Sequence, residues 1–203
     1  MFHNLISAEL TTDRAMQLAG WLWCTLTAVW LALSFTIKDV KRRETVGQRL
    51  QHVVPLLVAF WLLFNHARYW QWLNFRILPR TPVFSWLGLV IAATGVAISI
   101  WARLSLGANW SGIVTLKENH ELIRTGLYSR IRHPIYTGIL LAFVGTAIIE
   151  GELRCLVGFA ILLATFHFKA KREEGLLHQE FGAGFVDHHS RTGMFLPKLT
   201  STP

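Results

Sequence analysis

The sequence predicts an all-α membrane protein, a polytopic helical bundle of about five transmembrane helices. Three observations predict this fold class. The chain is 52% hydrophobic and only 16% charged, whereas soluble domains are about 25% charged. Several apolar runs approach the roughly 20 residues that a bilayer-spanning helix needs. Nine tryptophans and thirteen phenylalanines are typical of chains whose aromatic rings gather at membrane interfaces.

Five apolar runs are expected to enter the bilayer. In chain order they are Leu18–Ile37, Val53–Phe75, Val83–Leu104, Pro134–Ile149 and Leu153–Phe168. The second run is interrupted by polar residues at Asn65–Arg68. Only Glu-Gly-Glu separates the last two runs, which predicts a tight hairpin of two antiparallel helices.

Small residues recur at helical spacing in the third and fourth runs. Such stripes let helix backbones approach closely in lipid, so we expect these residues to lie at helix–helix contacts. The stripes consist of Gly88, Ala92, Gly95 and Ser99, and of Gly138, Ala142 and Gly145.

The placement of the basic residues predicts the orientation. With five spans and an external N-terminus, the outside carries five of the 20 lysines and arginines: Arg14, Arg68, Arg76, Arg80 and Arg154. The other fifteen lie inside, as the positive-inside rule requires. We therefore expect a cytoplasmic C-terminus. We also expect the net charge of +8 to reflect basic residues on the cytoplasmic side of the membrane, and we expect no nucleic-acid partner. The acidic first sixteen residues argue against a cleavable signal peptide.

Two polar segments on the predicted cytoplasmic side carry the chemistry. Pro134 is expected at the first position of a helix, which leaves the N–H groups of Ile135, Tyr136 and Thr137 free to bind an anion beside Arg132 and His133. The alternative is that the arginines only contact lipid headgroups. Glu173 and Glu174, expected at a helix C-terminus, either face a cationic ligand or form surface ion pairs.

The hairpin brings these two groups to the same end of the bundle. We expect them to face each other across about one helix spacing, roughly 8–10 Å. A zwitterion with an amino and a carboxyl group, such as the methionyl part of S-adenosylmethionine, fits that gap.

The motifs resemble those of the isoprenylcysteine carboxyl methyltransferase family. "ELIRTGLYSRIRHPIYTG" is followed some 35 residues later by "REEGLLHQEFG", and the similarity extends from about Leu106 to Pro197. The resemblance implies an integral membrane enzyme that transfers a methyl group from S-adenosylmethionine to a lipidic acceptor, most naturally a prenylcysteine-type or isoprenoid carboxylate. It also implies one domain, residues 1–203, with N-terminal transmembrane helices in 1–82 and a cofactor-binding catalytic core in 83–203.

The resemblance carries roles to individual positions. Cofactor-binding residues would be His120, Glu121, Leu122, Ile123, Tyr128, His133, Tyr136 and Glu173. Lys169 stands where eukaryotic members have an arginine that contacts substrate, and tyrosines of relatives are replaced by Phe185 and His188. Catalysis would need no residue beyond those that position the cofactor, since a carboxylate is already a nucleophile.

Two other functions remain open from the sequence. One is a nicotinamide-dependent membrane reductase with a similar C-terminal helical arrangement, and the other is a non-enzymatic membrane partner protein. We expect no metal, because the adjacent His188 and His189 point in different directions and lack accompanying carboxylates or thiols. His167 is expected to pack within the bundle, and Cys24 and Cys155 are expected to be inert thiols.

Overall fold

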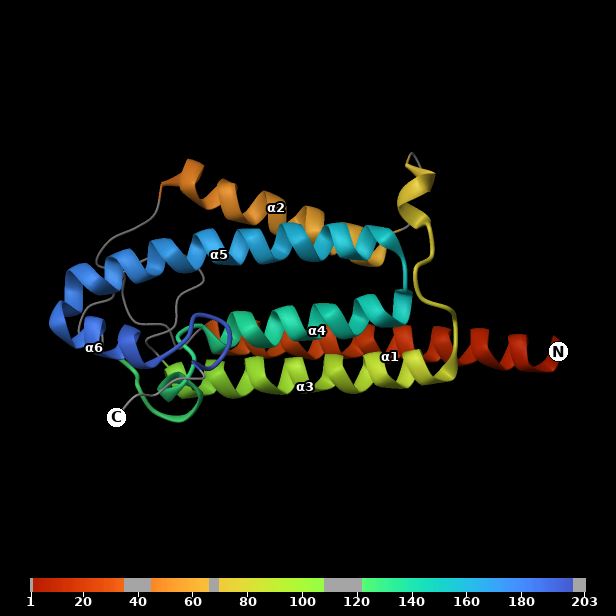
Figure 1. Cartoon of the computed structure of the whole chain (residues 1–203), viewed down its shortest axis with the longest axis horizontal. Helices are drawn as coiled ribbons and strands as arrows, with labels where there is room; N and C mark the ends of the chain where they lie inside the picture. The colour runs from red at the N-terminus through yellow and green to blue at the C-terminus, as the bar shows by residue number, and fades with distance from the viewer. Residues whose placement is uncertain (1, 35–44, 66–69, 108–121, 199–203) are drawn as a thin grey trace.

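The computed structural model describes residues 2–34, 45–65, 70–107 and 122–198, and the side chains from residue 9 onward. Its helices follow the apolar runs in chain order (Figure 1). They are α1 (Phe2–Ser34), α2 (Val46–Phe64), η1 (Gln71–Asn74), α3 (Pro82–Leu106), η3 (Gly126–Ser129), α4 (Pro134–Glu150), α5 (Leu153–Phe181) and α6 (Ala183–Arg191).

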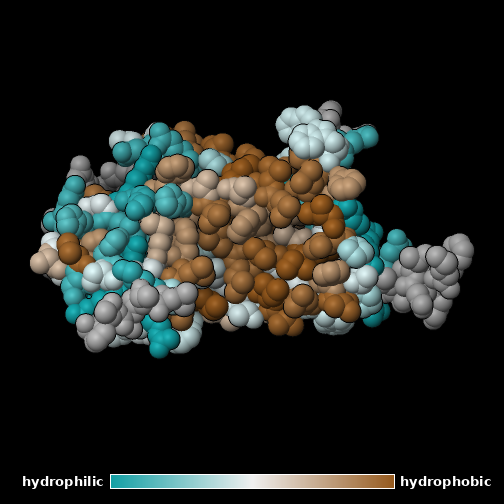
Figure 2. Space-filling view, in the orientation of Figure 1, coloured by the Kyte–Doolittle hydropathy of each residue, from teal (hydrophilic) through white to brown (hydrophobic). Residues whose placement is uncertain are grey.

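The chain is an integral multi-pass membrane protein. Within the described residues, the helices α1, α2, α3 and α5 are long and apolar enough to cross a membrane, and α4 is a shorter apolar helix. Figure 2 shows an apolar band around the middle of the molecule and a hydrophilic end that carries α6. The expected bundle of about five membrane helices is therefore confirmed, with α4 as its shortest member.

The boundaries of three helices differ from the sequence prediction. The second run was expected at Val53–Phe75, but α2 spans Val46–Phe64 because Thr45 and Gln48 form a capping box at its start. The first helix begins at Phe2 instead of Leu18, and the expected end at Ile37 lies outside the described residues. The fifth helix continues past Phe168 to Phe181.

Helices α3 and α4 are in direct backbone contact along their small-residue stripes. A Cβ atom added at Gly95 would lie 2.5 Å from the carbonyl oxygen of Gly138, and one added at Gly145 would lie 2.5 Å from that of Gly88. Ser99 at the end of the α3 stripe donates to the Ile135 carbonyl at 3.1 Å. The stripes therefore face each other, as expected for close packing in lipid.

The hairpin between α4 and α5 turns within two residues, Gly151 and Glu152. Gly151 adopts the left-handed conformation (φ 67°, ψ 23°), which glycine adopts readily because it has no Cβ atom. The two helices then separate: α4 packs chiefly on α3, and α5 packs chiefly on α2 (Figure 1). The turn is as tight as predicted, but each arm of the hairpin takes a different main partner.

A buried arginine holds the turn to the end of α2. The Arg154 side chain is 1% exposed. It donates to the carbonyl oxygens of Leu62 and Leu63 at 2.6 and 2.8 Å, and to the carboxylates of Glu150 and Glu152 at 2.9 and 2.7 Å. The last carbonyls of a helix lack hydrogen-bond donors within the helix. Arg154 provides donors for two of them at the end of α2.

At the other end of the bundle, Arg103 of α3 is fully buried. It donates to the Leu33 carbonyl of α1 at 2.8 Å and to the Gly107 carbonyl at 2.9 Å. The segment before α4 and the residues after α6 lie at this same end (Figure 1). This hydrophilic end therefore gathers the polar segments on which the functional predictions depend.

Candidate functional site

The start of α4 brings the first part of the site into place. Pro134 occupies the opening of the helix, as predicted, with His133 as the N-terminal cap residue. The preceding backbone is paired with the chain after α6: the Arg132 and His133 N–H groups donate to the carbonyls of Gly193 and Met194 at 2.9 and 3.1 Å. Both side chains are thereby held at the hydrophilic end, where α5 passes.

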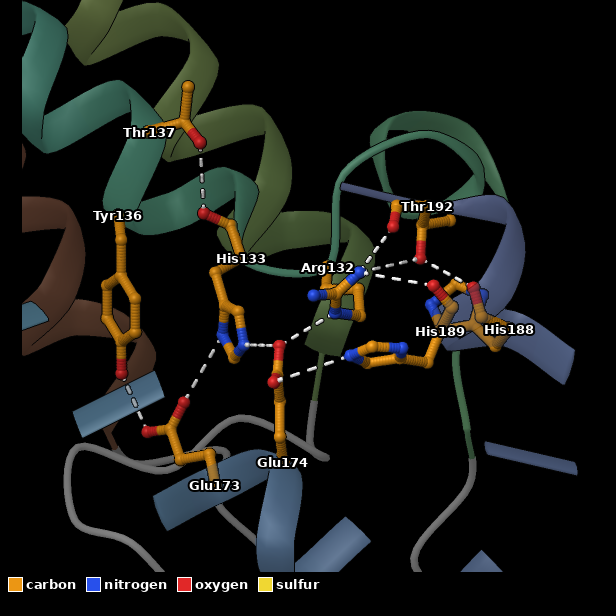
Figure 3. A network of polar contacts seen from close by, with 9 residues as sticks. All are labelled: Arg132, His133, Tyr136, Thr137, Glu173, Glu174, His188, His189 and Thr192. Atoms are coloured by element: carbon orange, nitrogen blue, oxygen red, sulfur yellow. Dashed lines mark hydrogen bonds and ion pairs between the residues drawn. The ribbon is translucent and has the colours of Figure 1, made fainter. Parts of the chain in front are cut away.

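The extended α5 supplies two carboxylates to this point (Figure 3). The Tyr136 hydroxyl donates to Glu173 Oε1 at 2.6 Å. His133 Nδ1 lies 3.4 Å from Glu173 Oε2, and His133 Nε2 lies 3.3 Å from Glu174 Oε1. The prediction that these groups meet at one end is confirmed, but the expected separation of roughly 8–10 Å is wrong because the side chains bridge the helices directly.

The position of the glutamates within α5 also corrects the sequence analysis. We expected both at a helix C-terminus, where the dipole disfavours carboxylates. Because α5 continues to Phe181, they lie about two turns before its end. Their neighbours, rather than the dipole, therefore determine their charge state.

Aromatic rings stack around Tyr136. The His133 ring is parallel to it at 5.4 Å between centroids, and the Phe166 ring lies 4.6 Å away with an interplanar angle of 18°. Lys169 Nζ lies 5.6 Å from the Tyr136 ring centroid, within the range of a cation–π contact. Stacking and the hydrogen bond to Glu173 together fix the tyrosine, and Lys169 lies next to its ring.

The two carboxylates determine the charge of His133. Burial of the ring disfavours its protonated form, but the contacts with Glu173 and Glu174 outweigh burial and raise the pKa of His133 above its ordinary value. Because each ring nitrogen faces a carboxylate oxygen, a doubly protonated imidazolium satisfies both contacts.

This pairing predicts how stability depends on pH. A histidine whose pKa is higher in the folded state stabilises the fold fully below its unfolded pKa of about 6.5, and that contribution is lost as pH rises through the folded value. Thermal unfolding in detergent should therefore show wild type losing its advantage over His133→Asn as pH increases from 6 to 9. A difference that stays constant or grows with pH would contradict the pairing.

The expected open anion site at the start of α4 is wrong in part. The Thr137 N–H donates to the His133 carbonyl at 3.1 Å as an ordinary helix bond, and the Thr137 hydroxyl donates to the Phe195 carbonyl at 2.7 Å. Arg132 does not face lipid headgroups either, because its side chain is 8% exposed and its Nε donates to Glu174 at 2.7 Å. Positive charge is present, but it is directed at the glutamates.

Of the remaining predicted cofactor residues, Ile123 and Tyr128 share an apolar cluster with Tyr136, and others fall outside the described residues. His120 and Glu121 fall outside the described residues. Leu122 is half-buried, and Ile123 packs in a cluster with Tyr128 and Ile135. The Tyr128 hydroxyl donates to the Ala102 carbonyl of α3 at 3.4 Å, so this tyrosine is joined to α3.

The three histidines without assigned roles take different positions. His167 is exposed with its ring against Phe168, so the expectation that it packs inside the bundle is wrong. His188 is buried, and its carbonyl accepts a hydrogen bond from Thr192 at 2.6 Å. His189 Nε2 lies 3.9 Å from Glu174 Oε2, which places it at the edge of the network.

Sequence reasoning missed the parts of the network that come after α6. Thr192 accepts from Arg132 through its carbonyl oxygen, and the Phe195 ring lies 6.3 Å from that of His133. No periodic pattern marks these residues. The available signals were the arginine-histidine dipeptide before α4 and the paired glutamates in α5. They indicated the site but not the residues after α6 that adjoin it.

Comparisons with known proteins point to one family. A model of the phospholipid methyltransferase family matches residues 83–184. The chain is 30% identical over 190 residues to the protein-S-isoprenylcysteine O-methyltransferase of Xenopus laevis. This match covers 88% of this chain and 63% of the Xenopus protein. It is 30% identical over 191 residues to a probable protein-S-isoprenylcysteine O-methyltransferase of Oryza sativa subsp. indica, covering 90% and 98%.

This chain belongs to the isoprenylcysteine carboxyl methyltransferase family. Family membership implies a methyl donor. A solved structure of the eukaryotic intramembrane Ras methyltransferase ICMT also matches, with a TM-score of 0.51 at 25% identity over 72% of this chain and 52% of that one. The chain thus spans nearly all of the rice relative but less than two thirds of the Xenopus relative.

Proposed function

We propose that this chain is an integral membrane methyltransferase that moves a methyl group from S-adenosylmethionine to a lipidic acceptor, most specifically a prenylcysteine-type or isoprenoid carboxylate. The observation that carries the proposal is the contact of Glu173 with both Tyr136 and His133, 2.6 and 3.4 Å away, at the hydrophilic end of an apolar bundle. The relatives that match this chain bear methyltransferase names.

The residues present fit a cationic methyl donor. Glu173 is the more accessible of the two glutamates, with 22% of its side chain exposed against 8% for Glu174, so it is the carboxylate that can meet an amino group. Tyr136 and Phe195 offer aromatic surface, which attracts cations. We assign Tyr136, His133 and Glu173 to the cofactor. On the strength of the resemblance alone we also assign His120, Glu121, Leu122, Ile123 and Tyr128.

The protein's own contribution to the reaction is positioning and charge. The bound sulfonium cofactor supplies an electrophilic methyl group, and an ionised acceptor carboxylate needs no general base. Glu173 neutralises the donor's amino group, while the imidazolium of His133 and the ammonium of Lys169 attract carboxylates. Holding both reactants in line while excluding water accounts for about 7–11 kcal/mol in favourable cases.

Lys169 is the proposed contact of the acceptor. It lies one turn before Glu173 on α5, above the Tyr136 ring, so it is close to the proposed reacting groups. A lysine provides a point charge, whereas the arginine of eukaryotic members provides a bidentate fork. We therefore expect weaker geometric selection of the acceptor carboxylate than an arginine would give.

The membrane orientation follows from the same proposal. We place the hydrophilic end with the site in the cytoplasm, so that the soluble cofactor enters from water and the apolar acceptor enters from lipid. The distribution of lysines and arginines supports this orientation. We also treat residues 1–203 as one domain, since Ala59 and Leu63 of α2 share a buried cluster with Phe143 and Leu162 from the core in 83–203.

A labelling experiment tests the function. Purified protein in lipid nanodiscs is incubated with S-adenosylmethionine carrying a radiolabelled methyl group and with a farnesylated cysteine analogue. We expect methyl label that is released by base, which identifies an ester, and at least a 100-fold lower rate for Glu173→Gln because its charge is removed. Glu180→Gln, an exposed carboxylate on the same helix, is the matched control and should keep the wild-type rate.

Other outcomes lead to other functions. Base-stable label would indicate N- or C-methylation of a different acceptor, such as a phospholipid amine. Saturable NADPH binding without S-adenosylmethionine binding would overturn the proposal in favour of a reductase, and binding of neither cofactor would favour a non-enzymatic partner. The methyltransferase names of the relatives favour the first function over both.

A further inference from the structure

A second buried ion pair lies beside the proposed cofactor residues and has no part in the proposed reaction. Arg132 and Glu174 are each 8% exposed at the side chain, and Arg132 Nε lies 2.7 Å from Glu174 Oε1. Neither is placed to meet a ligand as Glu173 is. Burying a charge is unfavourable unless the attraction to its partner offsets the loss of hydration. We therefore expect a structural role for this pair.

Arg132 joins α5 to the chain that follows α6 (Figure 3). We call residues Thr192–Phe195 the C-terminal strap. One guanidinium nitrogen of Arg132 donates to the Thr192 carbonyl, and its backbone N–H donates to the Gly193 carbonyl at 2.9 Å. The same side chain therefore contacts the carboxylate of α5 and the first residue of the strap.

The strap forms a wall of the proposed site. The His133 N–H donates to the Met194 carbonyl at 3.1 Å, and the Thr137 hydroxyl donates to the Phe195 carbonyl at 2.7 Å. The Phe195 ring then lies 6.3 Å from that of His133 and 6.5 Å from that of Tyr136. Releasing the strap would remove this aromatic wall.

Glu174 also determines the orientation of His133. Its Oε1 lies 3.3 Å from His133 Nε2, while Glu173 faces Nδ1 from the other side. A neutral imidazole has a single N–H donor, so it can satisfy only one carboxylate. With both glutamates ionised, the ring is held protonated and in a single orientation.

We propose that Arg132 and Glu174 are positioning residues: they form a clamp that aims His133 at Glu173 and fastens the C-terminal strap over the site. This inference rests on the proposed function for its consequence in cofactor binding. The clamp touches neither donor nor acceptor. Glu173 and Glu174, although adjacent in the sequence, therefore have separate roles, one toward the ligand and one toward the fold.

Charged and titratable groups face His133 from every neighbouring element. The carboxylates of Glu173 and Glu174 face it from α5, while Lys169 and the Tyr136 hydroxyl act on Glu173. Arg132 precedes His133 in the chain, His189 of α6 lies against Glu174, and the strap contributes backbone carbonyls. Among these, the two carboxylates favour the imidazolium, and Glu174 can be neutralised without altering the proposed cofactor ligand.

The first arm of the test measures the titration of His133 directly. Ring ¹⁵N shifts of histidine-labelled full-length protein in nanodiscs are followed with pH, and His133 is assigned by the loss of its signal in His133→Asn. Glu174→Gln should lower the midpoint by at least about one pH unit, since a nearby opposite charge contributes about 1–3 units. Glu174→Asp should retain most of the wild-type midpoint, and Glu180→Gln all of it.

The second arm measures the strap. Arg132→Lys keeps the charge but loses the fork that reaches both Glu174 and Thr192. We expect amide hydrogen exchange of residues 192–198 to accelerate at least tenfold, with a comparable weakening of S-adenosylmethionine binding in calorimetry. Arg130→Lys, an exposed neighbour, should change neither.

The outcomes separate the clamp from the proposed function. An unchanged His133 midpoint in folded Glu174→Gln, or unchanged strap exchange in Arg132→Lys, overturns the clamp even if methyl transfer is intact. A wild type that never binds S-adenosylmethionine overturns the proposed function, and the titration and exchange measurements then still decide the clamp. If Glu174→Gln does not fold, the Arg132→Lys arm decides it alone.

Discussion

Arg154→Met is expected to destabilise the protein by about 3–5 kcal/mol, the range seen when one partner of a buried ion pair is removed. The arginine is 1% exposed and contacts two carboxylates and two main-chain carbonyls. Methionine fills similar space but removes the cation that Glu150 and Glu152 share, although Arg76 still lies 3.8 Å from Glu152. Thermal and denaturant unfolding of the purified protein, followed by tryptophan fluorescence, measures the loss.

Two comparisons isolate the cause of that loss. Adding Glu150→Gln and Glu152→Gln to Arg154→Met should restore part of the stability, because uncompensated charge carries much of the penalty. Arg80→Met is the matched control: Arg80 is 39% exposed and lies 3.9 Å from Glu9, and surface pairs contribute only about 0–1 kcal/mol. Equal effects of Arg154→Met and Arg80→Met would contradict the buried network.

Gly95→Leu is expected to prevent α3 and α4 from packing, and Gly95→Ala to cost about 1–3 kcal/mol, the usual range for overpacking a filled interface. A Cβ atom at this position meets the Gly138 carbonyl oxygen at 2.5 Å and the Ala142 Cα at 2.8 Å. Both atoms belong to the backbone of α4, which cannot move aside as a flexible side chain can. The helices must therefore separate.

The same substitution should reach the proposed site. Gly138 lies two residues after Tyr136 on α4, so displacing α4 also displaces the tyrosine that contacts Glu173. Gly95→Ala should thus weaken S-adenosylmethionine binding as well as stability. Gly20→Ala is the control, since an added Cβ there meets nothing within 4 Å. If Gly95→Ala matched Gly20→Ala in both measurements, the close α3–α4 contact would be wrong.

The two predictions concern opposite ends of one hairpin. Arg154 holds the turn between α4 and α5 to the end of α2, whereas Arg132, His133 and the two glutamates hold the other ends of α4 and α5 together. Between these two ends, α4 packs along α3 and α5 packs along α2. The proposed site is therefore formed where two helix pairs converge through polar side chains, which is also where a soluble cofactor and a membrane acceptor can meet.

Much of the candidate site could be predicted because its signals are local. Proline at the start of an apolar run indicated the beginning of α4, and the short Glu-Gly-Glu link required the two flanking helices to return to the same end. The resemblance then identified Tyr136, His133 and Glu173. The contacts of Arg132 with Glu174 and with the strap could not be predicted in this way, since these partners are distant in the sequence and carry no periodic pattern.

By itself, the sequence determined the helical membrane class, the tight hairpin and the stripes of small residues, because each depends on hydrophobicity, turn chemistry or spacing within a short segment. That the two stripes face each other was decided by the tertiary structure. Only the tertiary structure decided that α5 continues to Phe181, that the charged groups touch directly, and that Glu173 and Glu174 face different nitrogens of one histidine. The physical reason is that periodicity fixes a residue's angle about its own helix axis. Which side chain meets which across two helices depends on their relative rotation and distance, and these are set by packing between segments far apart in the chain.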